Sequence, residues 1–120
     1  MTCKVSLLIN HIAPFLASAQ AICQEQQLES SAIAHAGSGL IYLQLSPADA
    51  LDRLANAISQ LRALAVSDKG SLVMTNAPTA LKAQVNVWGE ARPDLHLMET
   101  LKQQFDPQQT LVKGRFVGGL

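Results

Sequence analysis

Residues 30–46 read SSAIAHAGSGLIYLQLS, and this stretch decides the fold. Two runs that favour extended structure, 31–36 and 40–45, flank the triplet Gly37-Ser38-Gly39. Glycine adopts positive φ at little steric cost, so both glycines suit the tight turn of a β-hairpin. Side chains of the second run alternate between the two faces of a sheet. One face carries Ile41, Leu43 and Leu45, and the other carries Leu40, Tyr42 and Gln44.

A strand and a helix are expected before this hairpin. Lys4–Ile9 alternates as a strand, with Val5, Leu7 and Ile9 on one face. Asn10 can cap a following helix that has Pro14 in its first turn. Apolar residues then recur at helical spacing and predict a face turned to the core. They are Ile12, Phe15, Leu16, Ala19, Ile22 and Cys23.

A second helix and a fourth strand are expected after the hairpin. Ser46 suits the N-cap and Pro47 the first helical position, so the helix is predicted to begin there and to end near Ser67. Its apolar face contains Leu51, Leu54, Ala55, Ile58, Leu61 and Ala65. Lys69-Gly70 then turns the chain into a strand at Ser71–Thr75.

The order strand, helix, strand, strand, helix, strand predicts an α+β, ferredoxin-like βαββαβ sandwich. Both helices would cover one face of the sheet. The other face would carry Leu8, Leu40, Tyr42 and Val73. Because that face is too apolar to lie in water over its whole area, we expect a partner to cover part of it.

The remaining residues add an extra helix and an extended tail to the same domain. Residues 81–87 are expected to be extended, and Pro93-Asp94 to open a helix that ends at Asp106-Pro107. Leu97, Met98, Leu101 and Phe105 share one side of this helix, where Met98 and Phe105 are interpreted as core residues. Residues 108–120 form a glycine-bearing tail, and we expect residues 1–120 to form a single domain.

The composition excludes some functions and leaves one question open. Charged residues make up 15% of the chain, below the roughly one quarter that is usual. The surface is therefore either simply uncharged or partly buried against another domain or subunit. The net charge is zero without a basic stripe, so nucleic-acid binding is not expected. No apolar run is long enough to span a bilayer.

The cysteines and histidines indicate neither a redox centre nor a metal site. Cys3 and Cys23 lack a CxxC spacing and are interpreted as buried thiols in a reducing compartment. With no secretory signal visible, we expect the protein in the cytoplasm. The three histidines, His11, His35 and His96, stand in separate segments without metal-ligand spacing, so no metal is expected.

Three stretches near the end of the chain, VNVWG (85–89), LKQQFDP (101–107) and LVKGRF (111–116), resemble a known family. Together with the hairpin AHAGSGLIYLQL (34–45), they resemble the C-terminal cap domain of FAD-linked oxidases of the vanillyl-alcohol-oxidase type. Within that family, the sequence resembles the FAD-binding component of bacterial glycolate oxidase. The resemblance covers most of the chain. It departs at Val112-Lys113, where the family pattern has Asn-Pro before Gly-Arg.

The resemblance implies a part of a FAD-dependent oxidase of 2-hydroxy acids that is not catalytic alone. The family binds FAD mainly through an N-terminal domain with a glycine-rich loop, and this sequence has no such loop. We therefore expect the partners to be a flavin-binding domain and other oxidase subunits. Tyr42 stands where some relatives have a second histidine, which argues against a metal at the hairpin.

Six residues are candidates for contacts, and none is assigned a catalytic role. His35, Tyr42 and Arg115 are expected near substrate or flavin, while Trp88, Gly114 and Phe116 are expected at the interface with the flavin domain. For each, a purely structural role stays open: a packed Tyr42, for example, or a Trp88 that closes the sheet edge. The alternative function is a non-enzymatic ferredoxin-like module that forms a homodimer or binds a small molecule.

Overall fold

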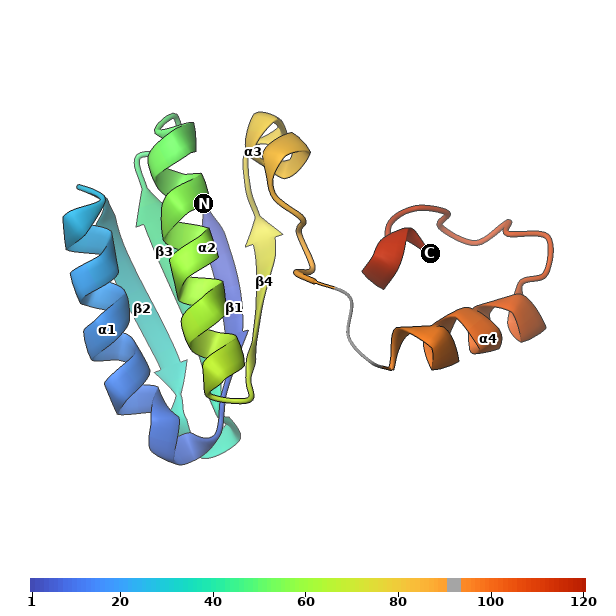
Figure 1. Ribbon diagram of the computed structural model, residues 1–120, viewed down its shortest axis with the longest axis horizontal. Coiled ribbons are helices and arrows are strands. Elements are labelled where there is room, and N and C mark those ends of the chain that lie inside the picture. Colours follow the sequence, from blue (N-terminus) through green and yellow to red (C-terminus); the bar gives the residue numbers. More distant parts are fainter. Residues whose placement is uncertain (91–93) are drawn as a thin grey trace. The chain divides into compact units, whose positions relative to one another are not determined.

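The computed structural model describes residues 1–90 and 94–120 and confirms the α+β, ferredoxin-like fold with an additional C-terminal helix (Figure 1). The chain divides into two compact units, Met1–Gly89 and Glu90–Leu120. The first unit contains β1 (Thr2–Ser6), η1 (Ile9–His11), α1 (Ile12–Glu25), β2 (Glu29–His35), η2 (Ala36–Ser38), β3 (Leu40–Ser46), α2 (Leu51–Ser67), β4 (Ser71–Asn76) and α3 (Thr79–Gln84). The second contains α4 (Leu95–Phe105) and η3 (Val117–Gly119).

The four strands form one antiparallel sheet in the order β2-β3-β1-β4. Helices α1 and α2 lie side by side on one face of this sheet (Figure 1). The core is the layer between them, and its largest fully buried side chains include Phe15, Ile41, Leu45, Leu54, Ile58 and Leu61. The apolar faces predicted for both helices and for β3 are therefore confirmed. None of the helices in the described ranges is long and apolar enough to cross a membrane.

The opposite face of the sheet, which we call the open face, carries Lys4, Ile33, His35, Leu40, Tyr42 and Val73. These side chains are half-buried or exposed, whereas their strand neighbours on the helix side of β1, β3 and β4 are buried. The prediction that Leu8 belongs to this face is wrong. Leu8 follows the end of β1 and is 57% exposed at the start of η1.

The hairpin turn requires glycine at one of its two glycine positions. Gly39 has φ of 69°, and a Cβ built there would lie 2.1 Å from the carbonyl oxygen of Leu7. The Leu7 amide donates to the Gly39 carbonyl at 2.8 Å, which holds the two backbones together. Gly37 does not adopt positive φ, so the prediction of two such glycines is wrong. The chain reverses direction through the 3₁₀ turn η2, and of the two glycines only Gly39 adopts positive φ.

Three predicted element boundaries differ from those of the structure. The first strand is Thr2–Ser6 rather than Lys4–Ile9, since Ile9 enters η1 and is exposed. Asn10 does not cap α1; His11 occupies that position without a side-chain cap. Ser46 remains paired with Glu29 in the sheet, so α2 begins at Leu51 instead of at Pro47.

The segment predicted to be extended over residues 81–87 is helical in its first half. Thr79–Gln84 forms α3, because Leu81 is fully buried against the core and its carbonyl accepts from the Val85 amide. Val85 itself has an extended backbone, and the Val87 carbonyl accepts from the Met74 amide at 3.0 Å. One backbone hydrogen bond is thereby made at the outer edge of β4.

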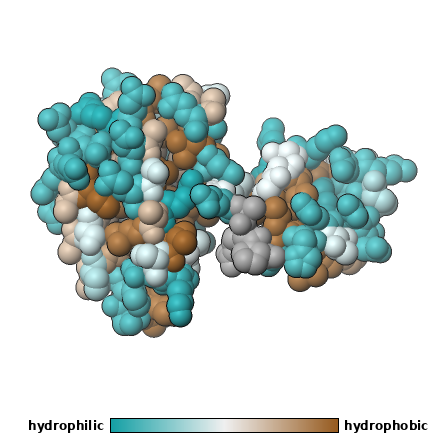
Figure 2. Space-filling view, viewed as in Figure 1, coloured by the Kyte–Doolittle hydropathy of each residue, from teal (hydrophilic) through white to brown (hydrophobic). Residues whose placement is uncertain are grey.

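In the second unit, α4 ends where Asp106-Pro107 predicts, but it contains no buried residue. The interpretation of Phe105 as a core residue is wrong, since it is 83% exposed, and Met98 is only half-buried. Leu97, Leu101 and Phe105 recur every fourth residue and form an apolar stripe that this unit leaves exposed. Hydrophobic side chains are visible on its surface in Figure 2. Pro93 lies outside the described residues.

We predict that Gly39→Ala destabilises the protein by at least about 2 kcal/mol, because a left-handed alanine and a backbone clash are both unfavourable. Chemical denaturation of the variant measures this difference. Gly37→Ala is the matched control, since a Cβ there meets nothing within 4 Å, and it should change stability by less than about 0.5 kcal/mol. Equal stability of the two variants would contradict the assigned turn geometry.

Candidate functional site

The open face presents a row of four side chains across the whole sheet. Ile33 pairs with Tyr42, Tyr42 with Lys4, and Lys4 with Val73, so one residue of each strand stands in this row. Residues directly opposite in adjacent strands have side chains about 5 Å apart at Cβ. A cation and a phenol therefore lie next to each other between two aliphatic side chains.

His35 lies on the same face, two residues beyond Ile33 at the end of β2. Its ring meets the Tyr42 ring edge-to-face, with centroids 5.9 Å apart and planes at 84°. This arrangement suits the charge distribution of aromatic rings and orients both side chains. The Ser38 hydroxyl donates to the His35 carbonyl at 3.2 Å and supports the turn that follows. The structure thus brings together two of the residues singled out by the sequence.

Lys4 is the functional candidate that the sequence analysis missed. It lies beside Tyr42 in the register of β1 and β3, half-buried on the open face. The alternation of Val5 with its neighbours already placed Lys4 on the face away from the core. The pairing with Tyr42, in contrast, depends on strand register, which a single sequence does not show.

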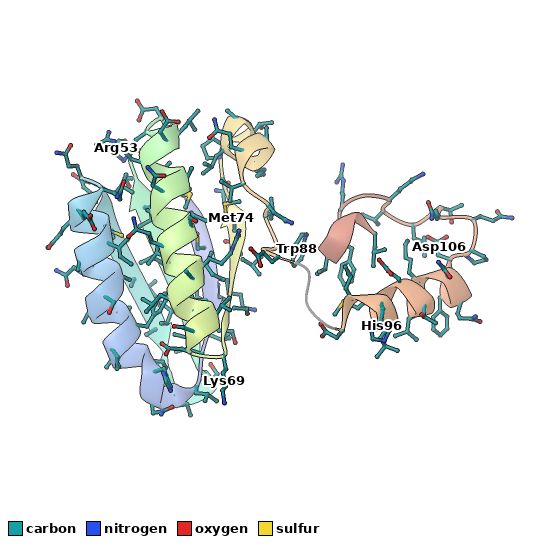
Figure 3. All side chains as sticks on the ribbon, in the orientation of Figure 1. Arg53, Lys69, Met74, Trp88, His96 and Asp106 are labelled. Carbon is teal, nitrogen blue, oxygen red and sulfur yellow. The ribbon has the colours of Figure 1, made fainter. Side chains whose placement is uncertain are left out.

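The second unit is organised around the carboxylate of Asp106, which is buried between the end of α4 and the following turn (Figure 3). Lys102 Nζ donates to Oδ2 at 2.6 Å and also to the Leu111 carbonyl at 2.6 Å. The amides of Thr110 and Leu111 donate to the two carboxylate oxygens at 2.8 and 2.9 Å. The Lys102 ammonium, followed by the Leu111 amide, holds the pKa of Asp106 well below its ordinary range.

The tail after this turn closes on its own last residue. The amides of Gly114 and Phe116 both donate to the Leu120 carbonyl, at 3.2 and 3.1 Å, and the Arg115 amide donates to Val112. Gly114 has φ of 79°, which favours glycine there. The side chains of Arg115 and Phe116 are exposed within this unit. They belong to a different unit from His35 and Tyr42.

Trp88 lies in the segment that follows α3, close to the end of the first unit (Figure 3). Its amide donates to Asn86 Oδ1 at 3.0 Å, and the neighbouring Val87 carbonyl makes the hydrogen bond to β4. Arg62 of α2 donates to the Asn86 carbonyl at 2.8 Å and holds the segment from the other side. The Trp88 side chain is 38% exposed, so part of its ring faces outward.

The two cysteines are free and fully buried on the helix side of the sheet. Burial raises the pKa of Cys3 to about 12 and also raises the pKa of Cys23. Both therefore remain thiols at neutral pH and are poor nucleophiles. Within residues 1–90 and 94–120, no group of three or more His, Cys, Asp and Glu side chains could hold a metal ion.

Comparison with protein families decides the assignment. The model of the C-terminal domain of FAD linked oxidases matches residues 1–115. The chain belongs to this family. No curated protein matches it. The FAD-linked oxidase family implies a flavin in the complete enzyme, and the present chain is its C-terminal domain.

Within the described ranges 1–90 and 94–120, the residues of this FAD-linked oxidase domain do not form a cradle for the flavin pyrophosphate. Such a cradle is usually a glycine-rich turn at a helix N-terminus. Helices α1, α2, α3 and α4 instead follow His11, Ala50, Pro78 and Asp94. No step of flavin chemistry is therefore assigned to the described residues.

Asp106→Asn is predicted to loosen the turn after α4, because the amide cannot pair with the Lys102 ammonium as a carboxylate does. Amide hydrogen exchange of Thr110 and Leu111 should become at least about tenfold faster, while α1 and α2 keep their protection. Glu99→Gln, at an exposed position of the same helix, is the matched control and should change neither. Unchanged exchange at Thr110 and Leu111 in Asp106→Asn would refute the role of the carboxylate.

The same carboxylate predicts a pH dependence with a definite sign. A depressed pKa in the folded state stabilises the turn above the unfolded value of about 3.9 and loses this effect as pH falls through the folded value. The amide resonances of Thr110 and Leu111 should therefore stay constant from pH 7 to about pH 4.5 and shift only in stronger acid. A titration of these amides centred above about pH 5 would contradict the buried ion pair.

Proposed function

We propose that this chain is the cap domain of a glycolate-oxidase-type 2-hydroxy-acid oxidoreductase, and that its open face covers the substrate. The observation that carries the proposal is the cluster of Lys4, His35 and Tyr42 on the open face, flanked by the aliphatic Ile33 and Val73. The family supports the cap role, and the resemblance to glycolate oxidase in the hairpin and C-terminal stretches supports the substrate class.

The chemistry of a 2-hydroxy acid matches these three side chains. Its carboxylate needs a cation or strong hydrogen-bond donors, which the Lys4 ammonium, the Tyr42 hydroxyl and the His35 ring provide. The flanking Ile33 and Val73 offer apolar surface that limits the access of water. In this proposal the chain binds and orients the substrate, and the oxidation belongs to the complete enzyme with its FAD.

The second unit would dock on the flavin-binding domain. Its apolar stripe, formed by Leu97, Leu101 and Phe105, is the kind of surface that interfaces bury. Arg115 could pair there with a carboxylate or phosphate, and Phe116 could fill an apolar notch beside Gly114. Trp88 would contribute as an aromatic anchor from the first unit. Two buried thiols support the cytoplasm as its location.

The alternative is a non-enzymatic module that forms a homodimer or binds a small molecule through the open face. The aliphatic character of Ile33, Leu40 and Val73 favours it, because such a face also suits a second copy. Under this alternative the chain would associate with itself through the open face and would ignore a flavin domain.

We predict that adding the chain to a separately expressed flavin-binding domain of glycolate-oxidase type gives a complex that oxidises a 2-hydroxy acid. Lys4→Ala should lower kcat/KM by about 10- to 100-fold, mainly through KM, because it removes a charge-assisted hydrogen bond. Tyr42→Phe and His35→Gln should each give smaller losses. Dye reduction driven by glycolate measures the rate.

Lys82→Ala, at an exposed position of α3, is the control and should leave the rate unchanged. If the chain forms no complex with the flavin domain, the cap proposal fails. If the complex is active but Lys4→Ala has no effect, the cap role stands and the assignment of the open face to the carboxylate fails.

A further inference from the structure

The outer edge of β2 is an unpaired sheet edge in the first unit. β2 stands at the end of the strand order, and its ladder within the described residues is with β3. All seven residues from Glu29 to His35 are exposed, including those on the helix side of the sheet. Figure 1 shows β2 at one border of the sheet, with α1 above it. An open edge of this kind is a template for another strand.

The strand register shows which backbone groups face outward. The N-terminal amine of Met1 donates to the Leu45 carbonyl at 2.7 Å, and the Leu45 amide donates to Met1 at 2.9 Å. Hydrogen-bonded and non-hydrogen-bonded residue pairs alternate along antiparallel strands. The backbone amides and carbonyls of β3 that point toward β1 are therefore those of Leu45, Leu43 and Ile41. The β3 residues between them direct their backbone amides and carbonyls toward β2 instead.

The same alternation continues through β2. Its residues opposite Gln44 and Tyr42, Ser31 and Ile33, turn their amides and carbonyls toward β3. Ser30, Ala32 and Ala34 consequently direct theirs to the free edge. On the other side of the sheet, this rule turns the Met74 amide outward, where it meets the Val87 carbonyl at 3.0 Å. The edge of β4 thus has a partner segment, and the edge of β2 has none among the described residues.

β2 also lacks the features with which sheet edges usually avoid pairing. Such edges carry lysine, proline or a bulge. Residues 29–35 read ESSAIAH, without lysine or proline, and their pairing with β3 runs without a register shift. Seven residues are a typical strand length, so the edge offers a complete site for one added strand.

We propose that β2 pairs with β2 of a second copy of this chain, antiparallel around a twofold axis at Ala32, and forms one continuous eight-stranded sheet. In this register Ser30, Ala32 and Ala34 meet Ala34, Ala32 and Ser30 of the other copy, and all their outward amides and carbonyls are satisfied. Glu29 stands opposite His35 at both ends, and no like charges face each other.

The helix above β2 supports the choice of a second copy. From Ile12 to Gln24, α1 contains no charged residue, and its Leu16, Ala19 and Gln20 lie next to β2. Interface cores are depleted in charge, and small side chains allow close packing. A hollow of about 270 Å³ lies between α1 and β2, lined by Leu16, Ala32 and Leu43 among others. A second copy at the edge would cover it.

Such a dimer is compatible with the cap role because it leaves both open faces uncovered. Its contacts form at the sheet edge and therefore need no flavin domain. It also differs from a homodimer through the open face, because the two dimers respond to substitutions on different surfaces. Burial of the uncharged surface of α1 and β2 in this dimer would explain part of the low content of charged residues.

The test is the mass of the full chain in solution, measured by sedimentation equilibrium over a concentration series. We expect a dimer with twice the 12.8 kDa of one chain. Ala32→Pro should raise the dissociation constant at least about tenfold, because it removes an outward amide at the centre of the pairing without breaking the bond to β3. Val73→Lys, on the open face, should leave the dimer intact.

A charge reversal tests the register. Glu29→Lys should weaken the dimer, and Glu29→Lys combined with His35→Glu should restore it, while circular dichroism verifies that each variant is folded. A monomer at every concentration overturns the proposal. A dimer that tolerates Ala32→Pro but dissociates in Val73→Lys also overturns it, in favour of pairing through the open face. Failure of the double variant to recover overturns the proposed register.

Discussion

The antiparallel pairing of β1 with β3 is the interaction on which the rest of the first unit depends. Met1 and Leu45 exchange backbone hydrogen bonds at one end, and Leu7 and Gly39 approach closely at the other. Between these two points the register directs Val5 and Ile41 to the core and Lys4 and Tyr42 to the open face. The same register directs the amides and carbonyls of alternate β2 residues to the free edge of the sheet. Core, open face and sheet edge are thus consequences of one ladder.

The second unit follows a different principle, because its described residues form no buried apolar layer. A single carboxylate, Asp106, gathers Lys102, Thr110 and Leu111 and determines how the chain leaves α4. The apolar side chains of α4 are left at the surface of this unit. A polar centre with an apolar exterior is typical of a segment that completes its packing against another surface. Membership in the FAD-linked oxidase family is consistent with an exposed apolar surface, because the C-terminal domains of this family accompany a flavin-binding domain.

Several features of the fold were accessible from the sequence because they depend on local periodicity. The alternation in 40–45 and the apolar stripes of both long helices predicted the buried faces of β3, α1 and α2. The boundaries were less accessible where distant residues compete with local preferences. Ser46 looks like a helix cap, but its pairing with Glu29 keeps it in the sheet, and Leu81 looks extended, but its burial favours a helix. Phe105 was misplaced because periodicity shows that a helix has an apolar side and not what covers that side.

The fold class could be predicted from the order of elements along the chain. A glycine in the tight turn and the end of α4 at Asp106-Pro107 could also be predicted, because they follow from steric rules that act over a few residues. Tertiary structure alone decided that Tyr42 stands between His35 and Lys4, that Asp106 organises the turn after its helix, and that β2 keeps a free edge. These arrangements join residues that are distant in the chain or depend on strand register. Register is set by the packing of the whole sheet, and for that reason no local pattern contains it.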